Sequence, residues 1–339
     1  MHRCLALAEQ GRGKTGINPM VGAVLVRPAG RVKSEKWKVE NELIIGEGYH
    51  QAFGGSHAEL QLFEKLDPTS PLRLRGAGQK ISSSDILYVS LEPCCHSHKK
   101  TPPCAQMLIE KGIKNIVIGM QDPNPEVAGK GIELLRSNDV NVSIAFALTA
   151  DCLRLNRGFV SLMTKGRPWI TLKQARTTDG RIANDEGSPL RITSKTQDEW
   201  SHSKLRAKHD AILVGIGTVL RDDPELTVRY TDNPPEIFRI ILDASLQIPL
   251  TARVVRRGTI VIASSPDQKK IKELENRGVR VLTVPQKSSI FDWNTLWKLL
   301  ITPESDFYGI SSILVEGGAK TWEIFRKAGM VDEEVTLLG

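Results

Sequence analysis

DILYVSLEPC, residues 85–94, is an apolar run that begins with an aspartate and ends with a proline and a cysteine. Its β-branched and aromatic residues predict a strand that delivers Cys94 at its end. His57-Ala58-Glu59 precedes this strand, and Pro102-Pro103-Cys104 follows it. An imidazole and two thiolates form a common three-ligand zinc set, in which the fourth position stays open to water. The sequence therefore predicts a zinc site made of His57, Cys94 and Cys104.

Glu59 stands two residues after His57, where its carboxylate can move a proton of the water on the metal. A His-x-Glu segment followed by paired cysteines is the signature of zinc deaminases. That signature has two residues between the cysteines, whereas nine separate Cys94 from Cys104 here, so a longer loop must bring them together. Pro102-Pro103 predicts a helix from Cys104 that Gly112 ends, and its N-terminus favours a thiolate.

The cysteine loop leaves two alternatives open. Cys95 adjoins Cys94 and forms a Cys-x-x-His pair with His98, so Cys95 could replace Cys94 as a ligand. A closed structural site that also uses His98 is the second alternative. Glu59 argues against a closed site, which needs no acid beside it. Each of these residues taken singly also has an ordinary structural reading, as a satisfied histidine or a small core cysteine.

Helix-like and strand-like segments alternate along residues 1–150, which predicts an α/β/α sandwich around the zinc residues. The expected elements are helix 2–10, strand 21–26, a helix after His57, strand 85–92, the Cys104 helix, strand 115–120, helix 131–137 and strand 140–147. A bridging helix around 155–159 and the breaker Gly166-Arg167-Pro168 follow. Residues 151–339 predict a second α/β domain, with strand-like runs at 169–175, 211–214, 239–243, 259–263, 279–284 and 310–315.

Composition limits the class of protein. At 339 residues the chain exceeds the usual size of one domain. The net charge of +7 is spread along the sequence and aromatic residues make up 5%, so nucleic acid is not an expected partner. No apolar run approaches the ~18 residues of a membrane helix, and the N-terminus has no signal-peptide pattern. With two or three of the five cysteines committed to metal, we expect a reducing, cytoplasmic location.

Two local features carry no function. Gly11-x-Gly13-x-x-Gly16 matches the dinucleotide-binding pattern, but it follows a helix-like segment rather than a strand. Residues 27–43 are rich in Lys and Glu and predict an exposed insertion. Because the second domain has no valid dinucleotide fingerprint, its residues alone do not reveal a nicotinamide cofactor.

Motifs over nearly the whole chain resemble the bifunctional deaminase/reductase family of riboflavin biosynthesis. In the first half these are NPMVG at 18–22, GEGYH at 46–50, HAE at 57–59, LEPC at 91–94, TPPC at 101–104 and DPNP at 122–125 with Gly129 and Gly131. In the second half they are KQA at 173–175, DG at 179–180, LRA at 205–207, DAILVG at 210–215, DDPELTVR at 222–229 and VEGGA at 315–319. The motifs occur in family order, and TPPC together with DPNP is the most specific part.

The resemblance implies a cytidine-deaminase-like α/β/α sandwich in residues 1–150 and a dihydrofolate-reductase-like α/β domain in residues 151–339. It implies zinc-dependent hydrolytic deamination of 2,5-diamino-6-(5-phosphoribosylamino)pyrimidin-4(3H)-one, with Glu59 as the catalytic proton shuttle. NADPH-dependent reduction of the ribosyl group to a ribityl side chain follows. One Zn²⁺ per chain and NADPH are the implied cofactors, and a homo-oligomer is left open.

The resemblance also assigns contacts in both domains. The cofactor positions are Ala175, Thr218, Asp222, Gly317, Gly318, Ala319, Lys320 and Thr321. The substrate positions are Asn18, His50, Arg206, Leu226, Arg229 and Glu316. Lys100, next to Lys99 in the cysteine loop, is the candidate partner for a phosphate beside the zinc pocket, and a solvated loop charge is the alternative. Glycines after a strand let backbone N–H groups approach a phosphate at the start of the next helix. The two arginines are expected to grip the ribose 5-phosphate, and surface pairs with Asp210 or Asp222 are the alternative.

The chain departs from the family pattern in three places. Pro189-Leu190-Arg191 stand where the family has a Ser-x-Trp element, and the cysteine loop is one residue longer than usual. The chain also stops at Gly339, where the family adds further strands, so we expect an exposed sheet edge and a C-terminal truncation. A deaminase with a silent reductase domain is therefore an alternative, as are a nucleic-acid base deaminase and a zinc-stabilised interaction module.

Overall fold

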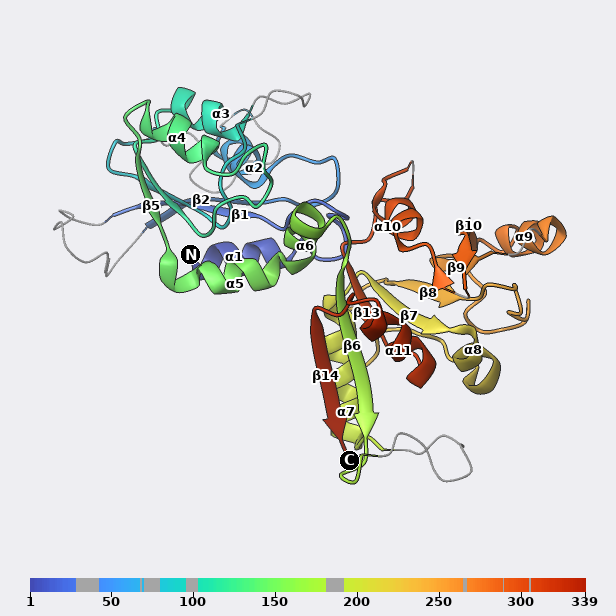
Figure 1. The fold of residues 1–339 in the computed structure, drawn as a ribbon. Coiled ribbons are helices and arrows are strands. Elements are labelled where there is room, and N and C mark those ends of the chain that lie inside the picture. Colours follow the sequence, from blue (N-terminus) through green and yellow to red (C-terminus); the bar gives the residue numbers. More distant parts are fainter. Residues whose placement is uncertain are drawn as a thin grey trace. The chain divides into compact units, whose positions relative to one another are not determined.

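The computed structural model describes residues 1–28, 43–67, 69, 80–95, 103–180, 192–264, 267–288, 290–304 and 306–339 (Figure 1). Two compact units divide the chain, Met1–Lys165 and Gly166–Gly339. The division falls at the Gly166-Arg167-Pro168 breaker, later than the limit at residue 150 expected from the sequence. The reason is that Phe159 and Val160, in the bridging segment, pack against the core of the first unit.

The first unit alternates helices and strands as the sequence predicts. Its elements are α1 (His2–Glu9), β1 (Gly22–Arg27), β2 (Leu43–Tyr49), α2 (Ala58–Leu66), β3 (Ile86–Val89), α3 (Cys104–Glu110), β4 (Asn115–Ile118), α4 (Lys130–Arg136), β5 (Asn141–Ile144), η1 (Phe146–Leu148), α5 (Thr149–Leu155) and α6 (Arg157–Lys165). The strand β2 was not expected. The first and last residues of the predicted insertion 27–43 are the last residue of β1 and the first residue of β2. Residues 29–42 of this insertion lie outside the described residues.

Within the described part of this unit, the sheet has five strands in the order β2-β1-β3-β4-β5. β1 pairs antiparallel with β2 and β3, while β3, β4 and β5 run parallel. Figure 1 shows α2, α3 and α4 on one face of the sheet and α1 and α5 on the other. Alternate residues of β1 lie on opposite faces of the sheet. Leu25 belongs to the core beneath α2, whereas Val24 packs with Leu7 of α1. The predicted α/β/α sandwich is confirmed.

Two glycines allow the helices to lie close to these strands. A Cβ at Gly22 would lie 2.0 Å from the carbonyl oxygen of Cys4, and one at Gly48 would lie 2.2 Å from that of Ala58. Both distances are far inside van der Waals contact, so only glycine fits at these positions. The close approach at Gly48 fixes the start of α2, which is where His57 and Glu59 lie.

The second unit is also α/β. Its elements are β6 (Trp169–Arg176), α7 (Lys195–Trp200), η2 (Ser201–Leu205), η3 (Arg206–Lys208), β7 (Ala211–Gly215), α8 (Ile216–Asp222), β8 (Phe238–Leu242), β9 (Thr259–Ala263), α9 (Gln268–Glu275), β10 (Arg280–Thr283), β11 (Gln286–Lys287), β12 (Ile290–Phe291), α10 (Trp293–Ile301), β13 (Ser312–Val315), α11 (Ala319–Lys327) and β14 (Glu333–Leu338). The six strand-like runs predicted for this half all form strands.

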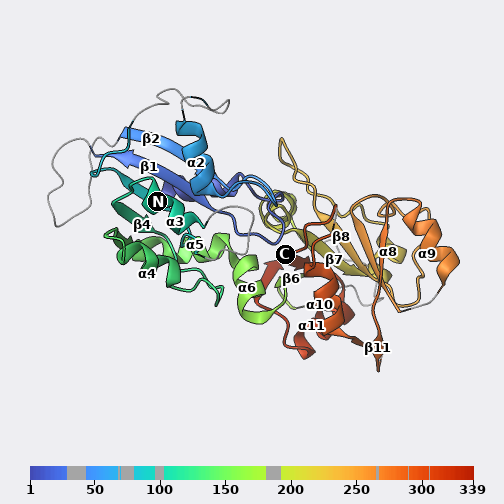
Figure 2. The same ribbon diagram turned by 90° about the horizontal axis from the view of Figure 1, so that it is seen from above.

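In the part that the structure describes, the main sheet of this unit has seven parallel strands in the order β10-β9-β8-β7-β13-β6-β14. One core packs α10 and α11 on one face, and a second packs α8 and α9 on the other. Figure 2 shows α10 and α11 side by side, where the rings of Trp293 and Phe325 are 5.1 Å apart. β13 returns between β7 and β6, so the carboxyl ends of β7 and β13 lie next to each other.

No described helix is long and apolar enough to cross a membrane. β14 forms one edge of the seven-stranded order and alternates partly buried with exposed side chains.

Candidate functional sites

His57 is the N-cap of α2, and Glu59 lies in the first turn of that helix. His57 has extended backbone angles, φ −64° and ψ 159°, so its side chain leaves the chain just before the helix begins. Glu59 is 3% exposed. One helix start therefore carries both the imidazole and a buried carboxyl, as the spacing of the two residues predicts.

The two cysteines reach the same place from different elements. Cys94 follows β3, and Cys104 is the first residue of α3. The N–H of Ala105 donates to the carbonyl of Cys94 at 3.1 Å, and the N–H of Cys104 donates to the Cys94 sulfur at 3.4 Å. These two hydrogen bonds hold the start of α3 against Cys94.

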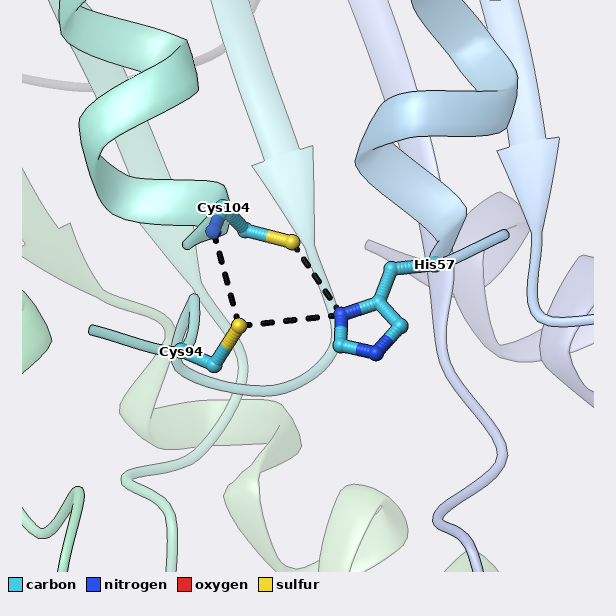
Figure 3. A group of neighbouring side chains, drawn as sticks. All are labelled: His57, Cys94 and Cys104. Atoms are coloured by element: carbon cyan, nitrogen blue, oxygen red, sulfur yellow. Dashed lines mark hydrogen bonds between the residues drawn. The ribbon is translucent and has the colours of Figure 1, made fainter. Parts of the chain in front are cut away.

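Figure 3 shows that His57, Cys94 and Cys104 point toward one another. The His57 Nδ1 lies 3.2 Å from the Cys104 sulfur and 3.6 Å from the Cys94 sulfur. The three ligand atoms all lie within 4.8 Å of one another. One nitrogen and two sulfurs at this spacing fit a zinc ion with an open fourth position. Among the described residues this is the one such cluster, and it contains Cys94 rather than Cys95.

The protonation of the cluster follows from its contacts. Hydrogen bonds from Cys104 and His57 lower the pKa of the Cys94 thiol to about 3. The Cys104 thiol donates a hydrogen bond to the Cys94 thiolate. This bond, together with burial, raises the pKa of Cys104. Burial raises the pKa of Glu59, so this carboxyl holds a proton more readily than an exposed glutamate does.

Glu92 holds the segment that contains the DPNP motif, a role that the sequence analysis missed. Its carboxylate is 3% exposed and accepts hydrogen bonds from the backbone N–H groups of Asp122, Gly129 and Ile132 at 3.0–3.1 Å. A Cβ at Gly131 would lie 2.2 Å from the carbonyl of Pro93. The LEPC and DPNP motifs therefore pack against each other. The sequence signal for this role of Glu92 is an acidic residue that accompanies a segment rich in turn-forming residues.

Asn18 and His50, two predicted substrate positions, lie together beside the zinc residues. The Asn18 amide is 3.3 Å from Nε2 of His50, and Nδ1 of His50 is 3.1 Å from the carbonyl of Ser56. The His50 ring meets the His57 ring edge-on, with centroids 5.9 Å apart. Asn156 fixes the neighbouring loop, because its amide bonds both the N–H and the carbonyl of Met20.

In the second unit, Arg206 and Glu316 form a buried bidentate ion pair. The Arg206 Nε and Nη2 donate to the two Glu316 oxygens at 2.7 Å each, and Nη1 donates to the Thr227 carbonyl at 2.8 Å. The Asp210 alternative for Arg206 is therefore wrong. Asp210 instead accepts from the backbone of Ser311. Burial acts to raise the pKa of Glu316, but the charge and hydrogen bonds of Arg206 outweigh it and lower the pKa to about 2.

Arg229 and Leu226, the other predicted substrate positions of this unit, lie on the segment that carries Thr227. Arg229 Nη2 is 3.0 Å from Nε2 of His202, which in turn contacts Arg206 and the Thr227 carbonyl. Leu226 is buried and has a positive φ of 49°. The structure thus gathers Arg206, Arg229 and Glu316 around His202, a residue that the sequence analysis did not single out.

The predicted cofactor positions fall mainly at the carboxyl ends of β7, β13 and β6. Gly317 and Gly318 follow β13, and Gly318 is the N-cap of α11. A Cβ at Gly317 would lie 2.7 Å from Cβ of Thr321, whereas a Cβ at Gly318 would meet nothing within 4 Å. Ala319 and Lys320 open α11, Thr218 and Asp222 lie on α8, and Ala175 is near the end of β6. Asp222 pairs with Arg221 rather than with either predicted arginine.

Several predicted features fall outside the described residues. They are Lys100, His98 and the Pro189-Leu190-Arg191 segment. Their roles stay predictions.

Both units match known families. Residues 1–120 match the cytidine and deoxycytidylate deaminase zinc-binding region, and residues 168–338 match the RibD C-terminal domain. The riboflavin biosynthesis protein RibD of Aquifex aeolicus is 36% identical over 340 residues, which cover 100% of this chain and 85% of that protein. RibD of Escherichia coli is 35% identical over 352 residues, with 100% and 86% covered.

Solved structures give the same result. Acinetobacter baumannii RibD, form 1, superposes with a TM-score of 0.77 at 30% identity, covering 100% of this chain and 85% of that one. A Thermotoga maritima structure titled as a diaminohydroxyphosphoribosylaminopyrimidine deaminase/5-amino-6-(5-phosphoribosylamino)uracil reductase has a TM-score of 0.74 at 33% identity, with the same coverage.

The fold and the sites define a two-domain enzyme that joins a zinc-binding deaminase to a reductase. The chain belongs to the RibD family of riboflavin biosynthesis. The predicted family, the two activities and the fold class are confirmed. Zinc and NADPH, the predicted cofactors, agree with these two domains.

Proposed function

We propose that this chain catalyses two successive steps of riboflavin biosynthesis on a phosphorylated pyrimidine. The first unit deaminates 2,5-diamino-6-(5-phosphoribosylamino)pyrimidin-4(3H)-one, and the second reduces the ribosyl group of the product to ribityl with NADPH. The observation that carries the first step is the convergence of His57, Cys94 and Cys104 next to a buried Glu59. The second step rests on membership of a family whose reductase domain spans residues 168–338.

His57, Cys94 and Cys104 hold the zinc ion in this proposal. Zinc supplies a Lewis acid that lowers the pKa of water at its open position. The Glu59 carboxylate takes a proton from the attacking water and returns it to the exocyclic nitrogen, which leaves as ammonia. The burial that raises the Glu59 pKa suits both halves of this task, because the group must accept a proton and hold it until the amine leaves.

Asn18 and His50 bind the pyrimidine in this proposal. They are hydrogen-bonded to each other and lie next to the His57 ring. Two neighbouring polar side chains on one side of the zinc ligands can fix the orientation of a flat ring and so present one amine-bearing carbon to the reacting water. Lys100 remains the predicted partner of the substrate phosphate.

NADPH supplies the hydride for the second step. The turn Gly317-Gly318 ends β13 and opens α11, where free backbone N–H groups favour a phosphate of the cofactor. Thr218 and Asp222 on α8, Lys320 and Thr321 on α11 and Ala175 on β6 complete the proposed cofactor contacts. Ligands of open parallel sheets bind at the carboxyl ends of the strands, near a strand that returns out of order, as β13 does here.

Arg206, Leu226, Arg229 and Glu316 bind the reductase substrate in this proposal.

A cytoplasmic location is also proposed, supported by five cysteines that are all free. A homo-oligomer stays a prediction.

The test is incubation of the zinc-loaded protein with the diaminopyrimidine phosphate, with and without NADPH. We expect ammonia release in both samples and loss of NADPH absorbance only in the second. Ammonia without NADPH oxidation would leave a deaminase with a silent reductase domain. NADPH oxidation that starts only after ammonia release would support the proposed order, and absence of both signals would refute the function.

A further inference from the structure

His202 lies in η2 at the centre of the charged cluster of the second unit. It is 6% exposed. Its Nδ1 is 3.1 Å from both the Thr227 carbonyl and Nη1 of Arg206, and its Nε2 is 3.0 Å from Nη2 of Arg229. The Tyr230 ring meets it edge-on, with centroids 5.5 Å apart. Each ring nitrogen of this buried histidine therefore faces a named partner.

These contacts fix the form of the ring. A guanidinium only donates hydrogen bonds, so Nε2 must accept from Arg229. A neutral imidazole with an accepting Nε2 carries its proton on Nδ1. Nδ1 then donates to the Thr227 carbonyl, and Nη1 of Arg206 donates to that same oxygen at 2.8 Å rather than to the ring. Burial first, and then the charges of Arg206 and Arg229, lower the pKa of His202 to about 4, while Glu316 acts in the opposite direction. The ring is therefore neutral near pH 7, as its hydrogen bonds require.

The two arginines are held differently. Three nitrogens of Arg206 are already bonded to Glu316 and the Thr227 carbonyl. Arg229 is an exposed residue, and within the described part of the chain its guanidinium makes one side-chain hydrogen bond, to His202. Its guanidinium also lies 5.8 Å from the centre of the exposed Tyr230 ring. Arg229 is thus the arginine with donors left for an incoming anion, and one histidine nitrogen holds it in place.

We propose that His202 is a positioning residue of the reductase, whose Nε2 orients Arg229 toward the phosphate of the substrate. This inference rests on the proposed reductase function. Arg206 then serves mainly to anchor Glu316 and the Thr227 segment, and Arg229 supplies the mobile charge. Orienting a flexible arginine in advance lowers the entropy that substrate binding must overcome, so the effect falls on KM rather than on kcat.

The first test compares His202→Leu, which removes the acceptor, with His202→Gln, whose side-chain oxygen can accept again. Each is made in the full-length zinc-loaded chain and assayed with deaminated phosphorylated substrate and NADPH. We expect His202→Leu to raise KM for this substrate about fivefold to tenfold, the typical net effect of losing one hydrogen bond, with kcat nearly unchanged. His202→Gln should restore most of the loss. The deaminase rate of the same samples and the thermal unfolding of the second unit report whether each variant is folded.

The second test asks whether His202 acts through Arg229. Arg229→Ala alone should raise KM about 10-fold to 100-fold, and adding His202→Leu to it should raise KM no further. A substrate lacking the phosphate should react equally in wild type and His202→Leu. Additive effects, an equal loss with the dephosphorylated substrate, or a loss in kcat alone would overturn the inference. If His202→Leu does not fold, His202→Gln decides alone, since a clear loss in that variant that is the same for the dephosphorylated substrate would also refute the inference. A wild type that does not oxidise NADPH would instead refute the proposed function.

Discussion

The zinc cluster of the first unit and the arginine cluster of the second are built in opposite ways. The zinc ligands and Glu59 lie within residues 57–104, at the starts of α2 and α3 and in the segment after β3, and short sequence motifs predict them. Arg206 and Glu316 are 110 residues apart, and each looks like an ordinary surface charge in the sequence. Zinc ligands are cysteines and histidines, which are uncommon enough to be recognised in a sequence. Arginine and glutamate are common surface residues, so a sequence does not show which of them will pair in the folded protein.

The two clusters also differ in charge balance. Cys94, Cys104 and Glu59 concentrate groups that become anionic, which favours a bound cation. Arg206 and Glu316 neutralise each other through two short hydrogen bonds. The first cluster therefore needs a cation to balance its charge, whereas the Arg206–Glu316 pair of the second balances its own charge. The following predictions test this contrast.

Loss of one zinc ligand should have the largest effect. We expect Cys104→Ser to release about one equivalent of zinc per chain and to abolish deamination, since two protein ligands rarely retain zinc. NADPH-dependent reduction of deaminated substrate should continue. Metal analysis and the two separate rate assays measure this. Cys4→Ser, which alters a fully buried cysteine of the same unit that bonds the Tyr88 carbonyl, is the control and should keep its zinc. Full zinc retention in Cys104→Ser would contradict the ligand assignment.

Removing the acid beside the zinc should spare the metal but not the reaction. Glu59→Gln is expected to keep zinc and to slow deamination by ~10²–10⁴-fold, the usual contribution of a general acid–base group. Glu64→Gln on the same helix, where the wild-type side chain bonds Ser56 at 3.2 Å, should change the rate little. Ammonia release measured at saturating zinc checks both. A Glu59→Gln rate near that of wild type would rule out the proton-shuttle role.

Breaking the ion pair should destabilise the second unit. Glu316→Gln leaves the buried Arg206 without its counter-charge, which costs about 3–5 kcal/mol. Five of the six tryptophans lie in this unit, so tryptophan fluorescence during denaturant unfolding reports on it. The control is Glu334→Gln, which breaks an exposed pair with Arg326 and should cost less than about 1 kcal/mol. Equal effects of the two substitutions would contradict the distinction between the pairs.

The same ion pair predicts a pH dependence. The folded pKa of Glu316 is about 2, below its ordinary value of 4.5, so the pair's contribution is present above pH 4.5 and is lost as pH falls toward 2. The contribution is about 3 kcal/mol, from the size of this pKa difference. Wild type and Glu316→Gln should therefore converge in stability on acidification. Curves that stay parallel from pH 6 to pH 3 would argue against this origin.

The smallest effect is expected at the glycine turn after β13. Gly318→Ala places its Cβ in open space, but alanine is a poorer helix N-cap than glycine, so the free energy of unfolding without cofactor should fall by about 1 kcal/mol or less. NADPH affinity should fall, because the added methyl group obstructs the close approach of a phosphate to the backbone. Gly317→Ala should destabilise the unit even without NADPH, owing to its 2.7 Å contact with Thr321. Calorimetric titration and thermal unfolding distinguish the two positions, and unchanged NADPH affinity in Gly318→Ala would place the cofactor elsewhere.

Much of the first unit could be predicted from the sequence. Its alternating pattern predicted the helices and strands around the ligands, and the Pro-Cys and Pro-Pro-Cys segments predicted where Cys94 and Cys104 would emerge. The strand β2 was missed because it follows a charged segment and carries two glycines that hide its periodicity. The structural role of Glu92 was missed, because its three backbone partners lie about thirty to forty residues further along the chain, in the segment before α4 and in α4 itself.

The sequence by itself determined the family, the α/β class of both units and the type of metal site, one histidine with two cysteines, since these depend on residue types and local spacing. Only the tertiary structure decided that Cys94 rather than Cys95 joins the described cluster, that Arg206 pairs with Glu316, and that His202 links the two arginines. Such choices depend on which side chains the strands and turns aim at one another. Charged and polar residues carry no periodic signal that reveals their partners, because burial and hydrogen bonding select those partners after the chain has folded.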